Sequence, residues 1–255
     1  MAILEYLKYQ KNAKTKYYLH SPFYYQFFLN ILEKNEIDEK TTNINAIVCQ
    51  LKKQKQLIEI QDFGAKKGVY KKSVATIAKN VIIPDKYGKV LTRVVHYFQP
   101  KTIVELGTSL GISSSYMAVA APNAAIVSFE GAPAVVAIAK KNHAQLQLKN
   151  IEIVEGDFAI TLAERLATIS QIDLAYIDAN HTYEATMAYF HLLKQKINEN
   201  SVLIFDDIYW SKGMQKAWQE IQKEEVVTAT IDIYKMGFVF FKKDKLAKQR
   251  IQLRY

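Results

Sequence analysis

Three carboxylates in the second half of the chain follow two apolar runs and could act together. Asp178 ends a run at residues 172–178, and the adjacent pair Asp206 and Asp207 closes another at residues 201–206. Because the carboxyl ends of parallel strands share one edge of a sheet, we expect these side chains to converge. Clustered carboxylates repel one another unless they share a proton or a cation. Such hard oxygen ligands suit Mg²⁺, Ca²⁺ or Mn²⁺, so the pattern predicts a divalent-cation site.

His181 lies three residues after Asp178 and could serve as a base. Its imidazole titrates near neutral pH, so it could take a proton from a substrate hydroxyl. A plainer interpretation makes His181 a surface or helix-cap residue. In that interpretation Asp207 caps the next helix and Asp206 binds backbone amides. The residues alone leave both interpretations open.

A glycine-bearing segment at residues 104–113 stands where a predicted strand gives way to a helix. Gly107 and Gly111 allow the backbone to approach a ligand closely. The start of the following helix offers free N–H groups to an anionic group such as a carboxylate. Glu105, just before the first glycine, could hold the ammonium group of the same ligand.

The same segment has two other interpretations. Residues 107–111 match G-x-S-x-G, the nucleophile elbow of α/β-hydrolases, with Ser109 as nucleophile. An acid before His181 or His191 would keep the required order of the triad, but the first 100 residues do not show the strands which that fold places before the elbow. A dinucleotide site is also disfavoured, because Ser109 replaces the glycine that approaches the pyrophosphate.

Two more acids end the next predicted strands. Glu130 ends residues 125–130 and follows Gly111 by 19 residues, close to the spacing at which an acid binds ribose hydroxyls. Asp157 follows residues 151–155 and could accept a hydrogen bond from an adenine amino group. Its plainer role is to cap the helix that begins at residue 158.

Alternating strands and helices must position these residues. We predict strands at 102–106, 125–130, 151–155, 172–178, 201–206, 226–234 and 238–242, and helices at 113–121, 133–146, 158–168, 183–196 and 212–223. This pattern indicates an α/β fold, Rossmann-like, with a seven-stranded mostly parallel sheet and an antiparallel edge strand. Upstream we predict helices at 23–33, 41–60, 70–79 and 85–98, and a loop at 62–68.

The pattern divides the chain into three parts. Residues 1–95 form a helical accessory or lid segment, residues 96–243 the main domain, and residues 244–255 a basic tail. The net charge of +9 comes from the first 100 residues, which hold 17 Lys+Arg against 8 Asp+Glu, whereas residues 101–255 hold 17 of each. This excess fits an anionic substrate, a nucleic acid or an anionic membrane surface, or simply lysine-rich helix faces.

Together these motifs resemble class I S-adenosylmethionine-dependent methyltransferases. Within that group they are most similar to O-methyltransferases of the catechol and caffeoyl-CoA kind and to bacterial relatives of unknown substrate. The resemblance covers residues 100–243 and extends upstream through residues 20–23 and 62–65. It implies that S-adenosylmethionine is bound by Glu105, Gly107, Ser109, Gly111, Glu130, Asp157 and Asp178.

The resemblance also bears on the acidic residues. In metal-dependent members of the family an Asp after the fourth strand and an Asp-Asn pair after the fifth hold the metal, which implies Asp178, Asp206 and Asp207 here. Asp207 stands where the family has Asn, so the implied metal site keeps an oxygen ligand here but carries one more negative charge. In the catechol enzymes a lysine base lies where this chain has His181. The implied chemistry is in-line methyl transfer to a small-molecule hydroxyl, with Asp178 and His181 catalytic.

Two rival functions remain. The charge favours an RNA methyltransferase, but the sequence lacks an Asn/Asp-Pro-Pro-Tyr-like motif, a well-placed catalytic cysteine and an RNA-binding module. An inactive scaffold would carry a broken cofactor site, whereas the acids and glycines are mostly intact. We expect a small-molecule acceptor, a homodimer, no membrane span and, from the single Cys49 and the absence of a signal peptide, a cytoplasmic location. We expect Cys49 to be buried.

Overall fold

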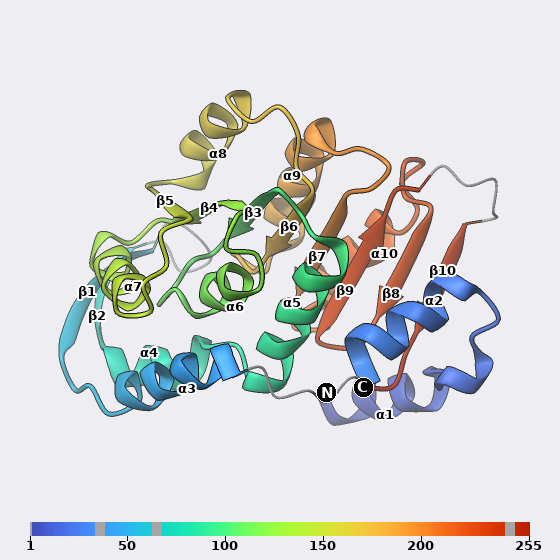
Figure 1. The fold of residues 1–255 in the computed structure, drawn as a ribbon, viewed down its shortest axis with the longest axis horizontal. Coiled ribbons are helices and arrows are strands. Elements are labelled where there is room, and N and C mark those ends of the chain that lie inside the picture. The colour runs from blue at the N-terminus through green and yellow to red at the C-terminus, as the bar shows by residue number, and fades with distance from the viewer. Residues whose placement is uncertain (1, 34–38, 63–67, 243–247) are drawn as a thin grey trace. The chain divides into compact units, whose positions relative to one another are not determined.

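A computed structural model describes residues 2–33, 39–62, 68–242 and 248–255 (Figure 1). Contacts group the chain into two compact units, residues 35–170 and residues 1–34 with 171–255. This division differs from the boundaries after residues 95 and 243, which follow where the strand–helix alternation begins and ends. Residues 63–65 of the loop that contributes to the resemblance lie outside the described residues, as do residues 244–247 of the expected tail.

The unit of residues 35–170 holds the glycine-bearing segment. Strands β3, β4 and β5 are parallel and lie in that order. The bounds of its elements are α3 Glu39–Leu51, β1 Leu57–Asp62, β2 Gly68–Ser73, α4 Val74–Val81, α5 Asp85–Phe98, β3 Thr102–Leu106, α6 Ile112–Ala120, β4 Ala125–Glu130, α7 Pro133–Gln145, β5 Ile151–Glu155 and α8 Phe158–Ala167.

Two predictions in the upstream part of this unit are wrong. Residues 57–60, expected to end the helix at 41–60, and residues 70–73, expected to begin the helix at 70–79, instead belong to the antiparallel hairpin β1–β2. The reason is a period-two pattern, in which Ile58 is buried between the exposed Leu57 and Glu59. Cys49 is exposed rather than buried, because the inward stripe of α3 is formed by Ile44, Ile47 and Leu51 instead.

The other unit holds the three carboxylates. Its strand order is β10-β8-β9-β7-β6, with β6 and β7 parallel, β9 antiparallel to both β7 and β8, and β10 parallel to β8. The bounds are α1 Ala2–Asn12, η1 Lys16–Tyr18, α2 Pro22–Phe27, η2 Phe28–Glu33, β6 Leu174–Ile177, α9 Tyr183–Leu193, η3 Lys194–Lys196, β7 Val202–Asp206, α10 Lys212–Ile221, β8 Ala229–Asp232, β9 Met236–Phe240 and β10 Gln249–Gln252.

The predicted α/β class with mostly parallel strands is therefore confirmed, with two differences in detail. The antiparallel strand is β9, and it lies between β7 and β8 rather than at an edge. Strand β10 adds an eighth strand from the segment expected to be a tail. It forms because Leu253 N donates to Asp232 O and the Leu253 side chain is fully buried.

Helices α1 and α2 contribute to the core of this unit. Phe27 is fully buried, and its ring lies 5.0 Å from that of Phe238 on β9. Tyr9 Oη donates to the carbonyl oxygens of Asp232 and Leu253, at 2.8 and 2.7 Å. In Figure 1 the blue helices α1 and α2 accordingly lie along the red strands β8 to β10. These helices bury aromatic area that the strands would otherwise expose to water.

The opposite face of β9 depends on a glycine. A Cβ at Gly237 would lie 2.6 Å from Cη2 of the Trp218 ring, which is only 4% exposed. Gly237→Ala should therefore lower the free energy of unfolding by about 1–3 kcal/mol through overpacking. Urea denaturation followed by tryptophan fluorescence measures this loss.

Gly213→Ala on α10 is the matched control, because its Cβ would lie at an ordinary contact distance, 3.4 Å from Tyr183 N. This change should stabilise the protein by about 0.5–1 kcal/mol, as alanine does in a helix. Equal stability of the two variants would contradict the packing argument.

Candidate functional site

The loop between β3 and α6 has the backbone shape that its glycines predict. Gly107, Ser109 and Gly111 all have positive φ, at 99°, 47° and 77°. The amides of Gly107 and Thr108 both donate to Phe129 O on β4, at 3.0 and 2.9 Å. The loop therefore turns tightly against β4 and leads directly into the first turn of α6, where amide groups have no partner within the helix.

Helix α7 holds the far end of this loop. Asn142 Nδ2 donates to Leu110 O at 2.8 Å, and His143 Nε2 lies 3.0 Å from Gly111 O. A Cβ at Gly111 would lie only 2.5 Å from His143 Nε2, so only glycine fits. Burial lowers the pKa of His143 to about 4, although its hydrogen bond with Gly111 opposes the shift. His143 is therefore neutral near pH 7.

Glu105 braces the loop from within the unit. Its side chain is fully buried, and its two carboxylate oxygens accept hydrogen bonds from the hydroxyls of Ser113 and Ser128. Ser128 Oγ in turn contacts Thr108 Oγ1. This arrangement fits a structural role for Glu105, and the predicted contact with a ligand ammonium stays a prediction.

Glu130 and Asp157 lie at the ends of neighbouring strands. Glu130 is half-buried and accepts hydrogen bonds from the amides of Ser109 and Ala132, at 2.9 and 3.0 Å. Asp157 Oδ1 accepts from Ala159 N at 2.9 Å, which is the plainer capping role for this residue.

His143 makes the stability of the loop depend on pH. Its pKa is about 4 in the folded protein against 6.5 for an ordinary histidine, so only the unfolded chain gains this proton readily as the pH falls. About 3 kcal/mol of stability should therefore be lost between roughly pH 6.5 and pH 4. Urea denaturation across this range should show the loss in the wild type and a much smaller one in His143→Gln.

The exposed histidine His96 on α5 gives the control, and His96→Gln should keep the acid loss of the wild type. An acid loss of the same size in His143→Gln would show that another group causes it.

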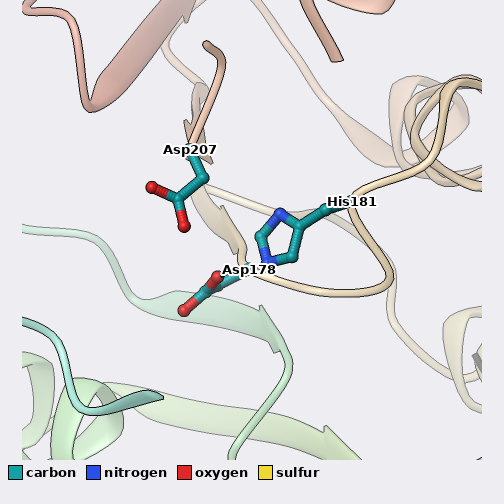
Figure 2. Close-up of side chains that lie close together, drawn as sticks. All are labelled: Asp178, His181 and Asp207. Carbon is teal, nitrogen blue, oxygen red and sulfur yellow. Dashed lines mark ion pairs between the residues drawn. The ribbon is translucent and has the colours of Figure 1, made fainter. Parts of the chain in front are cut away.

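The second cluster follows β6 and β7, as the sequence predicts, but its membership differs. One potential ligand atom from each of Asp178, His181 and Asp207 lies within 4.8 Å of the others (Figure 2). His181 Nε2 lies 3.2 Å from Asp178 Oδ1. Asn180, His181 and Asp207 all have positive φ, at 63°, 44° and 50°. Such conformations are costly for non-glycine residues and recur at functional sites, so they favour a functional interpretation.

Asp206 is not part of this group of three. It is 2% exposed, and its Oδ2 accepts from Tyr176 Oη at 2.9 Å. Its Oδ1 is buried and has no hydrogen-bond partner among the described residues. Burial, reinforced by Asp178 and Asp207, raises the pKa of Asp206 to about 7 against the opposing charge of Lys235.

Lys235 is a site residue that the sequence analysis missed. It lies between β8 and β9, and its Nζ is 2.7 Å from Asp207 Oδ1 and 3.1 Å from Asp206 Oδ2. Burial lowers the pKa of Lys235, but Asp206 and Asp207 outweigh it and raise the pKa above its ordinary value. The residue therefore stays charged. No spacing rule connects a lysine in a later turn to the ends of β6 and β7.

These contacts fit a bound divalent cation poorly. Asp207 and Asp206 already share the Lys235 ammonium, and Asp178 pairs with His181. A metal ion would have to displace the lysine to reach the Asp178, Asp206 and Asp207 set implied by the resemblance. The geometry favours compensation of the carboxylates by cationic side chains.

The aromatic residues after β7 have different environments. The ring of Trp210 is 71% exposed, with its centroid 6.3 Å from that of His181. Tyr209 instead donates to Asp232 Oδ2 at 2.6 Å and stacks on Tyr234. Of these two aromatic residues, Trp210 is open to solvent, whereas Tyr209 packs within its unit.

A comparison with protein families identifies the domain. Residues 104–208 match the family model described as a methyltransferase domain. The chain carries a methyltransferase domain. The match runs from β3 through the glycine loop to the end of β7, so the methyltransferase domain includes Glu130, Asp178, His181, Asp206 and Asp207. The prediction of a methyltransferase is confirmed.

Solved structures share the fold of the methyltransferase domain and much of the remaining chain. A methyltransferase of Podospora anserina with SAH bound is 12% identical, has a TM-score of 0.63, and covers 88% of this chain and 97% of its own. An O-methyltransferase of Bacillus cereus in complex with SAH is 16% identical, has a TM-score of 0.56, and covers 84% and 96%. At these identities the likeness shows the fold, which confirms the predicted Rossmann-like α/β class.

Proposed function

We propose that the chain transfers a methyl group from S-adenosylmethionine to a hydroxyl of a small molecule. The observation that carries this proposal is the methyltransferase-domain match over residues 104–208, which includes the constrained glycine loop and the Asp178–His181 pair. Two solved structures of similar fold support the proposal that S-adenosylmethionine is the methyl donor and that the methylated atom is an oxygen. They are the Bacillus cereus O-methyltransferase with SAH and TomG of Streptomyces achromogenes, an O-methyltransferase in complex with SAM.

The proposed roles around the glycine loop follow from its hydrogen bonds. The amides at the start of α6 have no partner within the helix and suit the carboxylate of the cofactor. Glu130 suits the ribose hydroxyls, because its bonds to the amides of Ser109 and Ala132 orient a half-buried carboxylate at the end of β4. Gly107 and Gly111 allow the cofactor to approach the backbone of the loop closely, and Glu105 holds the loop in this conformation through Ser113 and Ser128. Asp157 is proposed to accept a hydrogen bond from the adenine amino group.

The proposed base is His181. Its Nε2 faces Asp178 Oδ1, so a neutral ring donates from Nε2 and accepts a proton at Nδ1. As the acceptor oxygen bonds to the methyl carbon, the methyl–sulfur bond breaks and the hydroxyl proton passes to Nδ1. Asp178 fixes the tautomer and stabilises the imidazolium that forms. S-adenosylhomocysteine and the methylated acceptor are the products, and the balance needs no further reactant.

The proposed acceptor carries a flat apolar group. An indole ring that is 71% exposed near His181 suits stacking against an aromatic or conjugated acceptor. In the part of the chain that the structure describes, none of the helices is long and apolar enough to cross a membrane. A homodimer and a cytoplasmic location stay predictions.

Cofactor binding tests the proposal most directly. Isothermal titration of S-adenosylmethionine into the full chain should give binding that weakens by about ten-fold or more in Glu130→Ala, because hydrogen bonds to a charged group are lost. Glu164→Ala removes an exposed acid of α8 and should bind like the wild type. If the wild type does not bind S-adenosylmethionine, the proposed function is wrong.

The pH dependence of turnover tests His181. Burial alone would lower the pKa of His181, but Asp178, Asp207 and Asp206 together raise it above 6.5. Since the base must be neutral, kcat should rise as the pH increases through this raised pKa. In Asp178→Asn the rise in kcat should occur at lower pH. The reason is that Asp178 contributes most to the raised pKa of His181, and asparagine carries no charge.

His181→Gln should lose most turnover while its affinity for S-adenosylmethionine stays unchanged. A rising limb that does not move in Asp178→Asn, or full turnover in His181→Gln, would exclude His181 as the base.

A further inference from the structure

Lys235 lies at the tip of a tight connection between β8 and β9. Ile233 N donates to Met236 O and Lys235 N donates to Ile233 O, both at 2.9 Å, while Tyr234 has a positive φ of 70°. The connection directs the lysine to the end of β7. Its side chain is 20% exposed, so the ammonium group is largely withdrawn from water.

Neighbouring side chains hold this connection in place. The Tyr234 ring stacks on Tyr209, with 4.9 Å between centroids and 9° between planes. Tyr234 N donates to Asp232 Oδ1 at 2.8 Å, and Tyr209 Oη donates to Asp232 Oδ2. The rings of Tyr6 and Tyr9 on α1 pack edge-on against Tyr234. These contacts fix the turn that bears Lys235 independently of its ion pairs with Asp206 and Asp207.

The charges at the end of β7 need this cation. Asp206 and Asp207 are adjacent in sequence, and Asp206 is almost fully buried. A buried carboxylate beside a second, half-buried one is strongly destabilising unless a positive charge compensates them. Lys235 contacts both, at 3.1 and 2.7 Å, and its ammonium has three N–H donors for such contacts.

We propose that Lys235 is a built-in counter-cation that occupies the place of a divalent metal ion, so that this methyltransferase works without a metal. The inference rests on the proposed function only where it concerns methyl transfer. The structural part of the inference is that Lys235 keeps divalent ions from the carboxylates at the end of β7. This part depends only on the ion pairs of Lys235 with Asp206 and Asp207. Lys235 acts as a positioning residue, because it sets the charge and orientation of Asp206 and Asp207.

The test uses the metal alone. After treatment with EDTA and its removal, Mn²⁺ is titrated into the wild type, Lys235→Met and Lys235→Arg by calorimetry. Lys235→Met keeps the length of the side chain but removes the charge, so this variant should bind Mn²⁺ at least about ten-fold more tightly than the wild type. Its melting temperature should also rise when Mn²⁺ is added. Lys235→Arg keeps the charge and should behave like the wild type.

Micromolar binding of Mn²⁺ to the wild type would overturn the inference, as would equal affinity in Lys235→Met. If Lys235→Met does not fold without metal but does so with Mn²⁺, the inference is supported. If it folds under neither condition, Lys235→Gln replaces it, and the wild-type titration still decides the outcome.

A second arm separates this inference from the proposed function. Binding of S-adenosylmethionine and turnover in the wild type should be unchanged by EDTA. Turnover that EDTA abolishes and Mn²⁺ restores would overturn the role of Lys235 and leave the methyltransferase proposal intact. Failure to bind S-adenosylmethionine would overturn the methyltransferase proposal, while the Mn²⁺ titrations would still test Lys235.

Discussion

The burial of the Asp206 carboxylate at the end of β7 is the constraint on which one half of the molecule depends. The strand is buried along its whole length, so its last residue leaves water together with its neighbours. A buried carboxylate needs a proton, hydrogen-bond donors or a cation. Tyr176 on β6 supplies a donor and Lys235 supplies the charge. Both come from segments adjacent to β7, which couples the chemistry at this edge to the packing of the strands.

The same constraint explains the N-terminal helices. A flexible turn would lose backbone entropy when its lysine pairs with the carboxylates, whereas a turn that other contacts already fix has little backbone entropy left to lose. Tyr9 of α1 donates to the backbone of Asp232 and Leu253, and its ring packs against Tyr209 and Tyr234. Residues that are distant in sequence thus fix the turn bearing Lys235, so the first helix belongs to the support of the site.

The features that were predicted correctly are those that depend on residues close together in the sequence. The strands β3 to β7, the helices that follow them and the positive φ of Gly107 and Gly111 all follow from hydrophobic period and glycine chemistry. The proximity of the side chains that follow β6 and β7 was also predicted, because the carboxyl ends of parallel strands lie at the same edge of a sheet. In contrast, Lys235 and strand β10 depend on pairing between distant segments, for which one sequence offers no spacing rule. The hairpin β1–β2 was missed because its short alternating pattern resembles the end of an amphipathic helix.

Burial also separates the roles of the acids that looked alike in the sequence. Glu105 and Asp206 are almost fully buried, and neighbouring hydroxyls or the ammonium of Lys235 contact them, so they shape the loop and the strand end. Glu130, Asp178 and Asp207 are half-buried, so part of each carboxylate faces solvent. Since a ligand can compete only for oxygens that it can reach, the half-buried acids are the ones suited to bind cofactor and acceptor. Asp207 directly follows the buried Asp206, and Glu130 lies two residues after Ser128, whose hydroxyl donates to the buried Glu105, so in both places a buried acid is part of the strand end from which a half-buried acid projects.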